Sequence, residues 1–261
     1  MNINNILVPT DFSSYSEAAT SFAVDFALAQ NSRLYLMHSM KSIYSLSSER
    51  LLEELTADDR FKEIEVYPIT EIGDSVSAIL KGSKEVEADL ILMGNKGRSG
   101  VRKFIGSTTT EIISKSSIPV LTIPKESTYS GFDDIVFMTD FNEGDLPALK
   151  DLLDWGEIFD AEVHVVHIST DNDFEERIKY RGFKEVANEH TNYDNLTFKR
   201  LVNPSFFEGF VNFIKEKNTK LISATRYQKT FFQKLLQKDH TSMIGCEADT
   251  AFLTLNGEKY L

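Results

Sequence analysis

The chain carries the same series of short apolar segments twice, and this internal repeat limits its fold more than any other feature. Residues 5–12 and 134–141 both read as a short, mostly apolar segment followed by Thr-Asp-Phe, at an offset of 129 residues. Residues 34–38 and 163–167, which both end in His, repeat at the same offset. A nearly constant offset between similar segments is typical of two copies of one fold.

The repeat predicts two domains, at residues 1–125 and 133–261. The stretch between them is polar and contains Ser, Thr and Gly, as is typical of a short linker. A length of 261 residues fits this division, because a domain has about 100–200 residues.

Each half alternates short apolar runs with amphipathic stretches. In the first half the runs lie at 6–9, 34–38, 64–69, 90–93 and 120–123. The runs are mostly unbroken and rich in Ile, Leu and Val, which is typical of strands buried on both faces, as in a parallel sheet. Helix-start patterns lie between them, such as the capping box from Ser14 to Glu17 and the Asp74-Ser75 pair. We therefore expect an α/β fold with two tandem Rossmann-like domains, each a five-stranded parallel sheet flanked by helices.

The composition limits which binding partners and which cellular compartment we expect for this protein. The chain has 28 Lys and Arg against 40 Asp and Glu, a formal net charge of −12. A surface that binds nucleic acid or an anionic membrane needs excess positive charge, so we expect neither partner. No apolar run approaches the roughly 18 residues that span a bilayer. The single cysteine, Cys246, excludes an intrachain disulfide and predicts a cytoplasmic protein.

A glycine-rich segment begins with the fourth apolar run of the first half, at the sheet edge where parallel sheets bind ligands. Its Gly94, Gly97 and Gly106 leave room for backbone amides to approach a ligand. A helix is predicted to begin at Ser107 or Thr108, and a helix N-terminus favours a phosphate. The segment also holds four cations and no carboxylate. It therefore predicts an anionic ligand.

Together, several stretches resemble the universal stress protein (UspA) family: Thr10-Asp11-Phe12, Ala88–Gly94, the glycine-rich segment and Ser117–Ile123. The resemblance implies an adenine nucleotide alpha hydrolase-like Rossmann fold in both halves and a regulatory role in the stress response. Family members with the pattern Gly-x2-Gly-x9-Gly-[Ser/Thr] bind ATP. In this chain eight residues, rather than nine, separate the second and third glycines of that pattern.

The resemblance also implies a binding site for ATP, together with Mg²⁺, in the first half. The residues carried over to this site are Pro9, Thr10, Asp11, Ser39, Met93, Gly94, Lys96, Gly97, Gly106, Ser107, Thr108 and Thr109. Among them, Asp11 would lie near a ribose hydroxyl or the metal ion, and Ser39 would offer its backbone to the adenine edge. The last four would hold the outer phosphates. Lys96 departs from the histidine that is frequent at its position in the family.

The second half has lost the glycine pattern. At the positions of Gly94, Gly97, Gly106 and Ser107 it carries Ala224, Tyr227, Lys238 and Asp239. The tyrosine would fill the space of a phosphate or ribose, and a carboxylate at a helix start repels phosphate. We therefore predict a degenerate second domain that binds no nucleotide in this way.

These assignments have structural alternatives. The glycine-rich segment could be a surface turn with incidental basic residues, and Asp11 and Asp140 could simply cap the helices that follow them. Thr108 and Glu111 form a capping-box pattern that competes with phosphate for the threonine hydroxyl. The chain would then be a non-nucleotide-binding interaction module of the same fold.

Catalytic and metal-binding patterns are sparse. No pattern provides a defined catalytic base or an arginine finger, so we expect no enzyme, with slow ATP hydrolysis left open. A nucleotide alpha hydrolase would need a Ser-Gly-Gly-x-Asp-Ser loop after the first strand, which the sequence lacks. His164 and His167 point to opposite faces of a predicted strand and cannot share a metal. Asp11 is the candidate ligand for Mg²⁺.

Edge strands predict how the copies associate. Members of the family pair through their fifth strands, which covers otherwise exposed sheet edges. In this chain the corresponding segments are Val120–Ile123 and Phe252–Leu255. We expect them to meet within one molecule as an intramolecular pseudo-dimer, and association of two chains into a homodimer is a further expectation.

Overall fold

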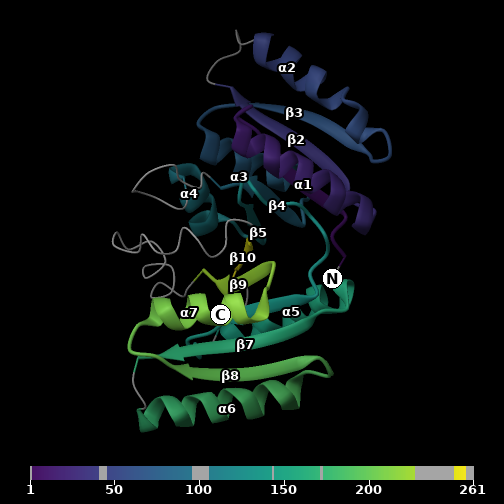
Figure 1. Ribbon diagram of the computed structural model, residues 1–261. Coiled ribbons are helices and arrows are strands. Elements are labelled where there is room, and N and C mark those ends of the chain that lie inside the picture. The colour runs from purple at the N-terminus through teal and green to yellow at the C-terminus, as the bar shows by residue number, and fades with distance from the viewer. Residues whose placement is uncertain are drawn as a thin grey trace. The chain divides into compact units, whose positions relative to one another are not determined.

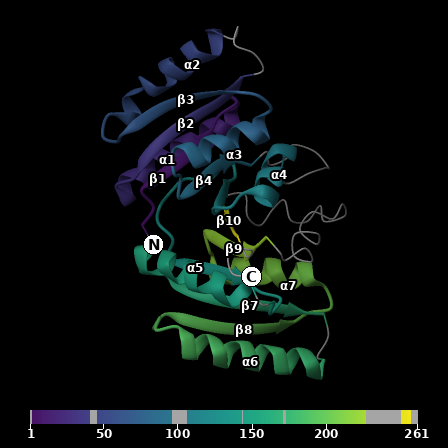
Figure 2. The same ribbon diagram turned by 180° about the vertical axis from the view of Figure 1, so that it is seen from behind.

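A computed structural model describes residues 2–40, 46–95, 106–142, 144–170, 173–226 and 250–256 (Figures 1 and 2). Its contacts divide the chain into two compact units, Asn2–Ser130 and Gly131–Leu261, here called the N-terminal unit and the C-terminal unit. In both units strands alternate with helices along the chain.

The N-terminal unit is an α/β domain with a parallel sheet. Its strands are β1 (Asn5–Pro9), β2 (Arg33–Met40), β3 (Val66–Ile72), β4 (Leu90–Gly94) and β5 (Val120–Ile123). Its helices are α1 (Ser14–Gln30), α2 (Leu46–Thr56), α3 (Ser75–Glu85) and α4 (Ser107–Lys115), with a 3-10 turn at Asp59–Phe61. The strand order is β3-β2-β1-β4-β5, and neighbouring strands pair in parallel. The predicted five-stranded Rossmann-like sheet is confirmed.

The C-terminal unit repeats this plan. Its strands are β6 (Asp134–Met138), β7 (Glu162–Ser169), β8 (Leu196–Val202), β9 (Leu221–Thr225) and β10 (Ala251–Leu255). Helices α5 (Asp145–Phe159), α6 (Phe174–His190) and α7 (Phe206–Lys217) connect them within the described ranges. The order β8-β7-β6-β9-β10 matches that of the first unit strand for strand, and the pairs are parallel. The predicted duplication of the fold is therefore present.

The core accounts for the most apolar of the strand segments. In β1, Ile6, Leu7 and Val8 all have no exposed surface. Successive side chains of a strand point to opposite faces, so both faces of the sheet are covered at β1. Strand β3, at the margin of the sheet, has no buried residue, so burial on both faces does not extend to it. In the C-terminal unit the core includes Trp155, a residue of α5 that has no exposed surface.

The helix starts follow capping chemistry, with one correction. Helix α1 is capped by Ser13, whose hydroxyl accepts a hydrogen bond from the amide of Ser16, and not by Ser14 as the sequence predicted. Glu17 does not complete a capping box, because its carboxylate pairs with Arg60. An arginine from another segment satisfies that carboxylate better than a cap amide would. The predicted start of α3 after Asp74 is confirmed.

A helix that spans a bilayer must be about 20 residues long and predominantly apolar. None of the helices in the described ranges combines the length and the apolar character that a membrane-spanning helix needs.

Candidate functional site

A pocket of about 180 Å³ lies at the carboxyl edge of the N-terminal sheet. Three strands reach it at their ends, β1, β2 and β4, and three helices reach it near their starts, α1, α3 and α4. Its walls are Pro9, Thr10, Asp11, Ser13, Tyr15, Ser16, Met37, Ser39, Ser75, Ile79, Met93, Gly94, Gly106, Ser107, Thr108 and Thr109. Parallel α/β sheets bind ligands at this edge, because the loops that follow the strands converge there.

Ten of the twelve predicted site residues line this pocket. The other two, Lys96 and Gly97, lie outside the described residues. Sequence reasoning missed the six other lining residues, which come from the start of α1, from β2 and from α3: Ser13, Tyr15, Ser16, Met37, Ser75 and Ile79. The Asp74-Ser75 helix start was a usable signal, because it follows the third apolar run directly.

The turn after β1 is held by its own side chains. The amide of Phe12 donates to the hydroxyl of Thr10 at 3.1 Å, and that hydroxyl is 3.2 Å from the hydroxyl of Ser16. The carboxylate of Asp11 accepts from the amide of Ser13 at 3.1 Å. Asp11 is also exposed and faces the pocket. It therefore stabilises the turn and remains positioned for a ligand.

A histidine supports this turn in each unit. The Nδ1 of His38 donates to the carbonyl oxygen of Thr10 at 2.8 Å, and its ring centroid is 4.7 Å from that of Phe12. His167 repeats the bond to Thr139 at 2.7 Å, with its ring 4.4 Å from Phe141. Phe12 and Phe141 both adopt the left-handed conformation, at φ 59° and 58°. That conformation costs free energy for a residue other than glycine, and the ring contacts compensate for it.

Gly94 is needed for helix packing as well as for the pocket. A Cβ at this position would lie 2.7 Å from the carbonyl carbon of Tyr15 and closer still to its oxygen. The absence of a side chain therefore lets the first turn of α1 rest directly on β4. The glycine pattern predicts a ligand-binding role for Gly94, and its contact with α1 is a second reason for a glycine at this position.

The start of α4 is open toward the pocket. Its N-cap is Gly106, and no side chain within the described residues caps it. The first backbone bond of the helix runs from the amide of Thr110 to the carbonyl of Gly106, which leaves three earlier amides without an intrahelical partner. The predicted capping box of Thr108 and Glu111 is wrong, because the helix already begins at Ser107 and Glu111 pairs with Lys115.

Hydroxyls and one cation complete the surroundings of the pocket. Ser39, near the end of β2, and Ser75, at the start of α3, are hydrogen-bonded at 2.8 Å between their Oγ atoms. The ammonium group of Lys125 lies 5.7 Å from the ring centroid of Tyr15, which lines the pocket. The lining is thus mostly neutral and polar, and Asp11 is the one charged residue among those that line it.

The C-terminal unit places a carboxylate at the matching position. With the two Thr-Asp-Phe turns aligned, Asp145 corresponds to Ser16. Asp145 has no exposed surface. Its oxygens accept from the hydroxyl groups of Thr139 and Thr225, both at 2.8 Å, and from the amides of Asp140 and Asn142 at 3.2 and 3.1 Å. A buried carboxylate needs such compensation, and it takes up the donors that the turn offers.

Other positions of the C-terminal unit also depart from their counterparts around the N-terminal pocket. Ala224 replaces Gly94, and α5 begins at Asp145, two residues later than α1 in the aligned turns. Helix α5 therefore lacks about half of the first turn by which α1 packs on Gly94. Three further predicted replacements, Tyr227, Lys238 and Asp239, fall in a part of the chain that the structure does not describe.

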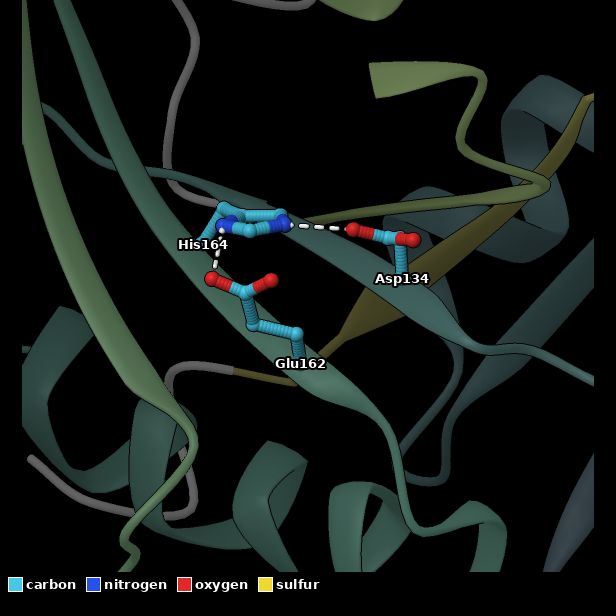
Figure 3. Close-up of side chains that lie close together, drawn as sticks. All are labelled: Asp134, Glu162 and His164. Atoms are coloured by element: carbon cyan, nitrogen blue, oxygen red, sulfur yellow. Dashed lines mark hydrogen bonds and ion pairs between the residues drawn. The ribbon is translucent and has the colours of Figure 1, made fainter.

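A second polar cluster lies at the opposite sheet edge of the C-terminal unit (Figure 3). Its members are Asp134, Glu162 and His164, whose ligand-type atoms all lie within 4.8 Å of one another. The Nε2 of His164 is 2.7 Å from Asp134, and its Nδ1 is 2.6 Å from the hydroxyl of Thr197 and 3.6 Å from Glu162. Because both ring nitrogens have hydrogen-bond partners, we assign this cluster a structural role in joining β6, β7 and β8.

The family model described as "Universal stress protein family" matches residues 2–124. The N-terminal unit belongs to the universal stress protein family. A universal stress protein of Methanocaldococcus jannaschii is 26% identical over 154 residues, which cover 47% of this chain and 95% of that protein. One from Synechocystis is 44% identical over 52 residues, which cover 20% of this chain and 18% of that protein.

The solved structures extend the universal stress protein fold to the second unit. The crystal structure of a universal stress protein from Archaeoglobus fulgidus matches with a TM-score of 0.75 and covers 98% of this chain and 100% of its own. Its sequence identity of 17% shows a shared fold alone. The C-terminal unit therefore keeps the fold of the family, whereas the family model matches the N-terminal half.

Proposed function

We propose that this chain binds ATP in the pocket of its N-terminal unit and acts as a stress-response regulator through the occupancy of that pocket. The observation that carries the proposal is the uncapped start of α4 in the pocket wall. Three backbone amides without an intrahelical partner and the positive end of the helix dipole favour phosphate oxygens. Gly106–Thr109, all in the lining, would hold the outer phosphates.

The remaining walls suit the nucleoside. Ser39 and Ser75 offer hydroxyls, Met37 and Ile79 offer apolar surface, and Asp11 offers a carboxylate to a ribose hydroxyl. A volume of about 180 Å³ is below the roughly 300–1,000 Å³ of pockets that enclose a whole ligand. We therefore place the nucleoside inside the pocket and the phosphates along the start of α4.

Mg²⁺ would enter with the triphosphate. Asp11 is exposed, and a single carboxylate together with phosphate oxygens is a common ligand set for this ion. The ion would neutralise phosphate charge next to this carboxylate. Asp11→Asn is then expected to weaken ATP binding in the presence of Mg²⁺ and to have little effect in the presence of a chelator.

We propose nucleotide binding for the N-terminal unit only, and we do not propose rapid hydrolysis of ATP. Asp145 already occupies the donors of the second turn, so we propose no nucleotide in the C-terminal unit. Among the described lining residues, Asp11 is the only side chain that could act as a base, and an arginine finger is missing from them. The proposal includes a cytoplasmic location, which rests on the single cysteine of the sequence.

Isothermal titration calorimetry of the full chain with ATP tests the proposal. We expect one site per chain, abolished by Gly106→Asp and retained by Lys238→Asp, the matching change in the second half. The backbone of Gly106, at φ −64° and ψ 157°, accepts any residue, and aspartate is a good N-cap. The Gly106→Asp variant should therefore fold, which circular dichroism can verify.

The calorimetry also discriminates the alternative. A chain that releases no heat with ATP, and that carries no nucleotide through purification by mass spectrometry, is a non-nucleotide-binding interaction module. Equal effects of Gly106→Asp and Lys238→Asp would contradict the assignment of the site to the N-terminal unit.

A further inference from the structure

Helix α6 is exposed along most of its length. Of its 17 residues, Ala187 is the buried one. Three large apolar side chains face solvent: Phe174 is 70% exposed, Ile178 54% and Val186 39%. Figures 1 and 2 show α6 against β8 at the margin of its unit, with its far side turned away from the sheet.

These apolar residues form one row. Phe174, Ile178, Gly182 and Val186 follow one another at intervals of four, which places them along the same side of a helix. A Cβ at Gly182 would meet nothing within 4 Å, so the row has an open position near its middle. Tyr180 lies on the inner side of the helix, where its hydroxyl donates to Phe198 of β8.

A row of charges runs beside the apolar row. Arg177, Arg181, Glu185 and Glu189 also follow at intervals of four, with two cations first and two anions after them. None of the four makes an ion pair within the described residues. By contrast, the neighbouring Glu175 and Lys179 are paired within the helix at 2.8 Å.

We infer that α6 is a docking surface for a second copy of this chain, which packs its own α6 antiparallel across a two-fold axis near Gly182. In that arrangement Arg181 faces Glu185 of the second copy, and Arg177 faces its Glu189, twice over by symmetry. A parallel arrangement would place like charges together. The missing side chain at Gly182 lets the two helices approach closely where they cross.

The order of the charges along α6, two cations followed by two anions, favours a second copy of this chain over other partners. A uniformly acidic or basic partner would meet like charges along half of the row. A copy of the same helix, reversed, matches both halves. The surface is distinct from the proposed nucleotide site, so the inference does not depend on ATP binding.

Sedimentation equilibrium of the full chain tests the inference over a concentration series up to about 1 mM, the concentration at which a dimer with a dissociation constant of about 1 mM is half formed. We expect a monomer–dimer equilibrium that Ile178→Asp weakens at least about tenfold, since a buried unpaired carboxylate is costly. The matched control is Leu51→Asp, which changes a 47% exposed leucine on α2 and should leave the equilibrium unchanged.

A charge exchange tests the antiparallel register. Arg181→Glu and Glu185→Arg should each weaken self-association at least about threefold, and an equimolar mixture of the two variants should restore it, because each then faces its opposite charge. Circular dichroism checks that both variants fold. A chain that stays monomeric throughout, or a dimer unaffected by Ile178→Asp, overturns the inference. Failure of the mixture to associate overturns the register.

Discussion

The hydroxyl of Thr225 donates a hydrogen bond of 2.8 Å to the buried carboxylate of Asp145 and so joins the end of β9 to the start of α5. In the N-terminal unit the matching helix start carries Ser16, which lines the pocket. The two copies of one fold thus use the same place differently. In the C-terminal unit the donors of the turn form hydrogen bonds to the buried carboxylate of Asp145. In the N-terminal unit a pocket lies beside the corresponding turn.

Replacement of Asp145 by alanine is expected to destabilise the C-terminal unit by about 2–4 kcal/mol, because two hydroxyls and two amides lose a buried acceptor. Trp155, the single tryptophan, lies fully buried on α5 and reports unfolding of this unit. Urea unfolding followed by its fluorescence measures the loss. Glu157→Ala, an exposed change on the same helix, is the control. An equal midpoint for both variants would show that the carboxylate is dispensable.

A methyl group at Gly94 should damage the N-terminal unit. Gly94→Ala places a carbon against the backbone of Tyr15 and is expected to cost about 1–3 kcal/mol and to weaken ATP binding. Thermal unfolding by circular dichroism and calorimetric titration measure the two effects. Ala224→Gly, the matching change in the other unit, should leave ATP binding intact. An unaffected Gly94→Ala protein would mean that α1 does not depend on this contact.

The cap of α3 should respond to acid. The amide of Ser77 donates to the carboxylate of Asp74 at 3.0 Å, and this hydrogen bond lowers the pKa of Asp74. A lowered pKa contributes stability that is fully present above the ordinary aspartate value of about 3.9 and is lost as the pH falls through the folded value. We therefore expect the amide resonance of Ser77 to shift below about pH 4.

Asp74→Asn keeps a neutral capping oxygen. In that variant the Ser77 resonance should no longer move with pH in the same range. A titration of Ser77 that survives the substitution would point to another carboxyl group as its cause.

Hydrogen exchange tests the predicted pairing of Val120–Ile123 with Phe252–Leu255. Amides of an edge strand that point away from its neighbour exchange quickly unless another strand covers them. If the two segments pair within one molecule, alternate amides in both should exchange slowly, and the rates should not depend on protein concentration. Fast exchange at either segment would refute the pseudo-dimer, and protection that disappears on dilution would indicate pairing between chains.

Much of the fold could be predicted from the sequence because its signals are local. Unbroken apolar runs such as Leu90–Met93 indicate strands buried on both faces, and the structure confirms this for β4. The repeated Thr-Asp-Phe turn indicated a duplicated fold, and both copies show the same strand order. These features depend on residues that are neighbours in the sequence.

The misses have a common cause. The predicted capping box at Ser14 is wrong because the carboxylate of Glu17 pairs with Arg60, which is 43 positions away in the sequence. The packing role of Gly94 was missed because the group that requires a glycine there, the backbone of Tyr15, is also distant in the sequence. Sequence patterns show which residues could bond locally, but not which distant group competes for them.

The duplication, the two parallel sheets and the residues at the carboxyl edge of the first sheet follow from sequence patterns alone. How the donors of each turn are used follows from the folded chain, because it depends on groups such as Thr225 and Asp145, which are 80 residues apart. Strand formation follows from the hydrophobicity of short segments. The satisfaction of a buried polar group depends on whatever the fold places within about 3 Å of it.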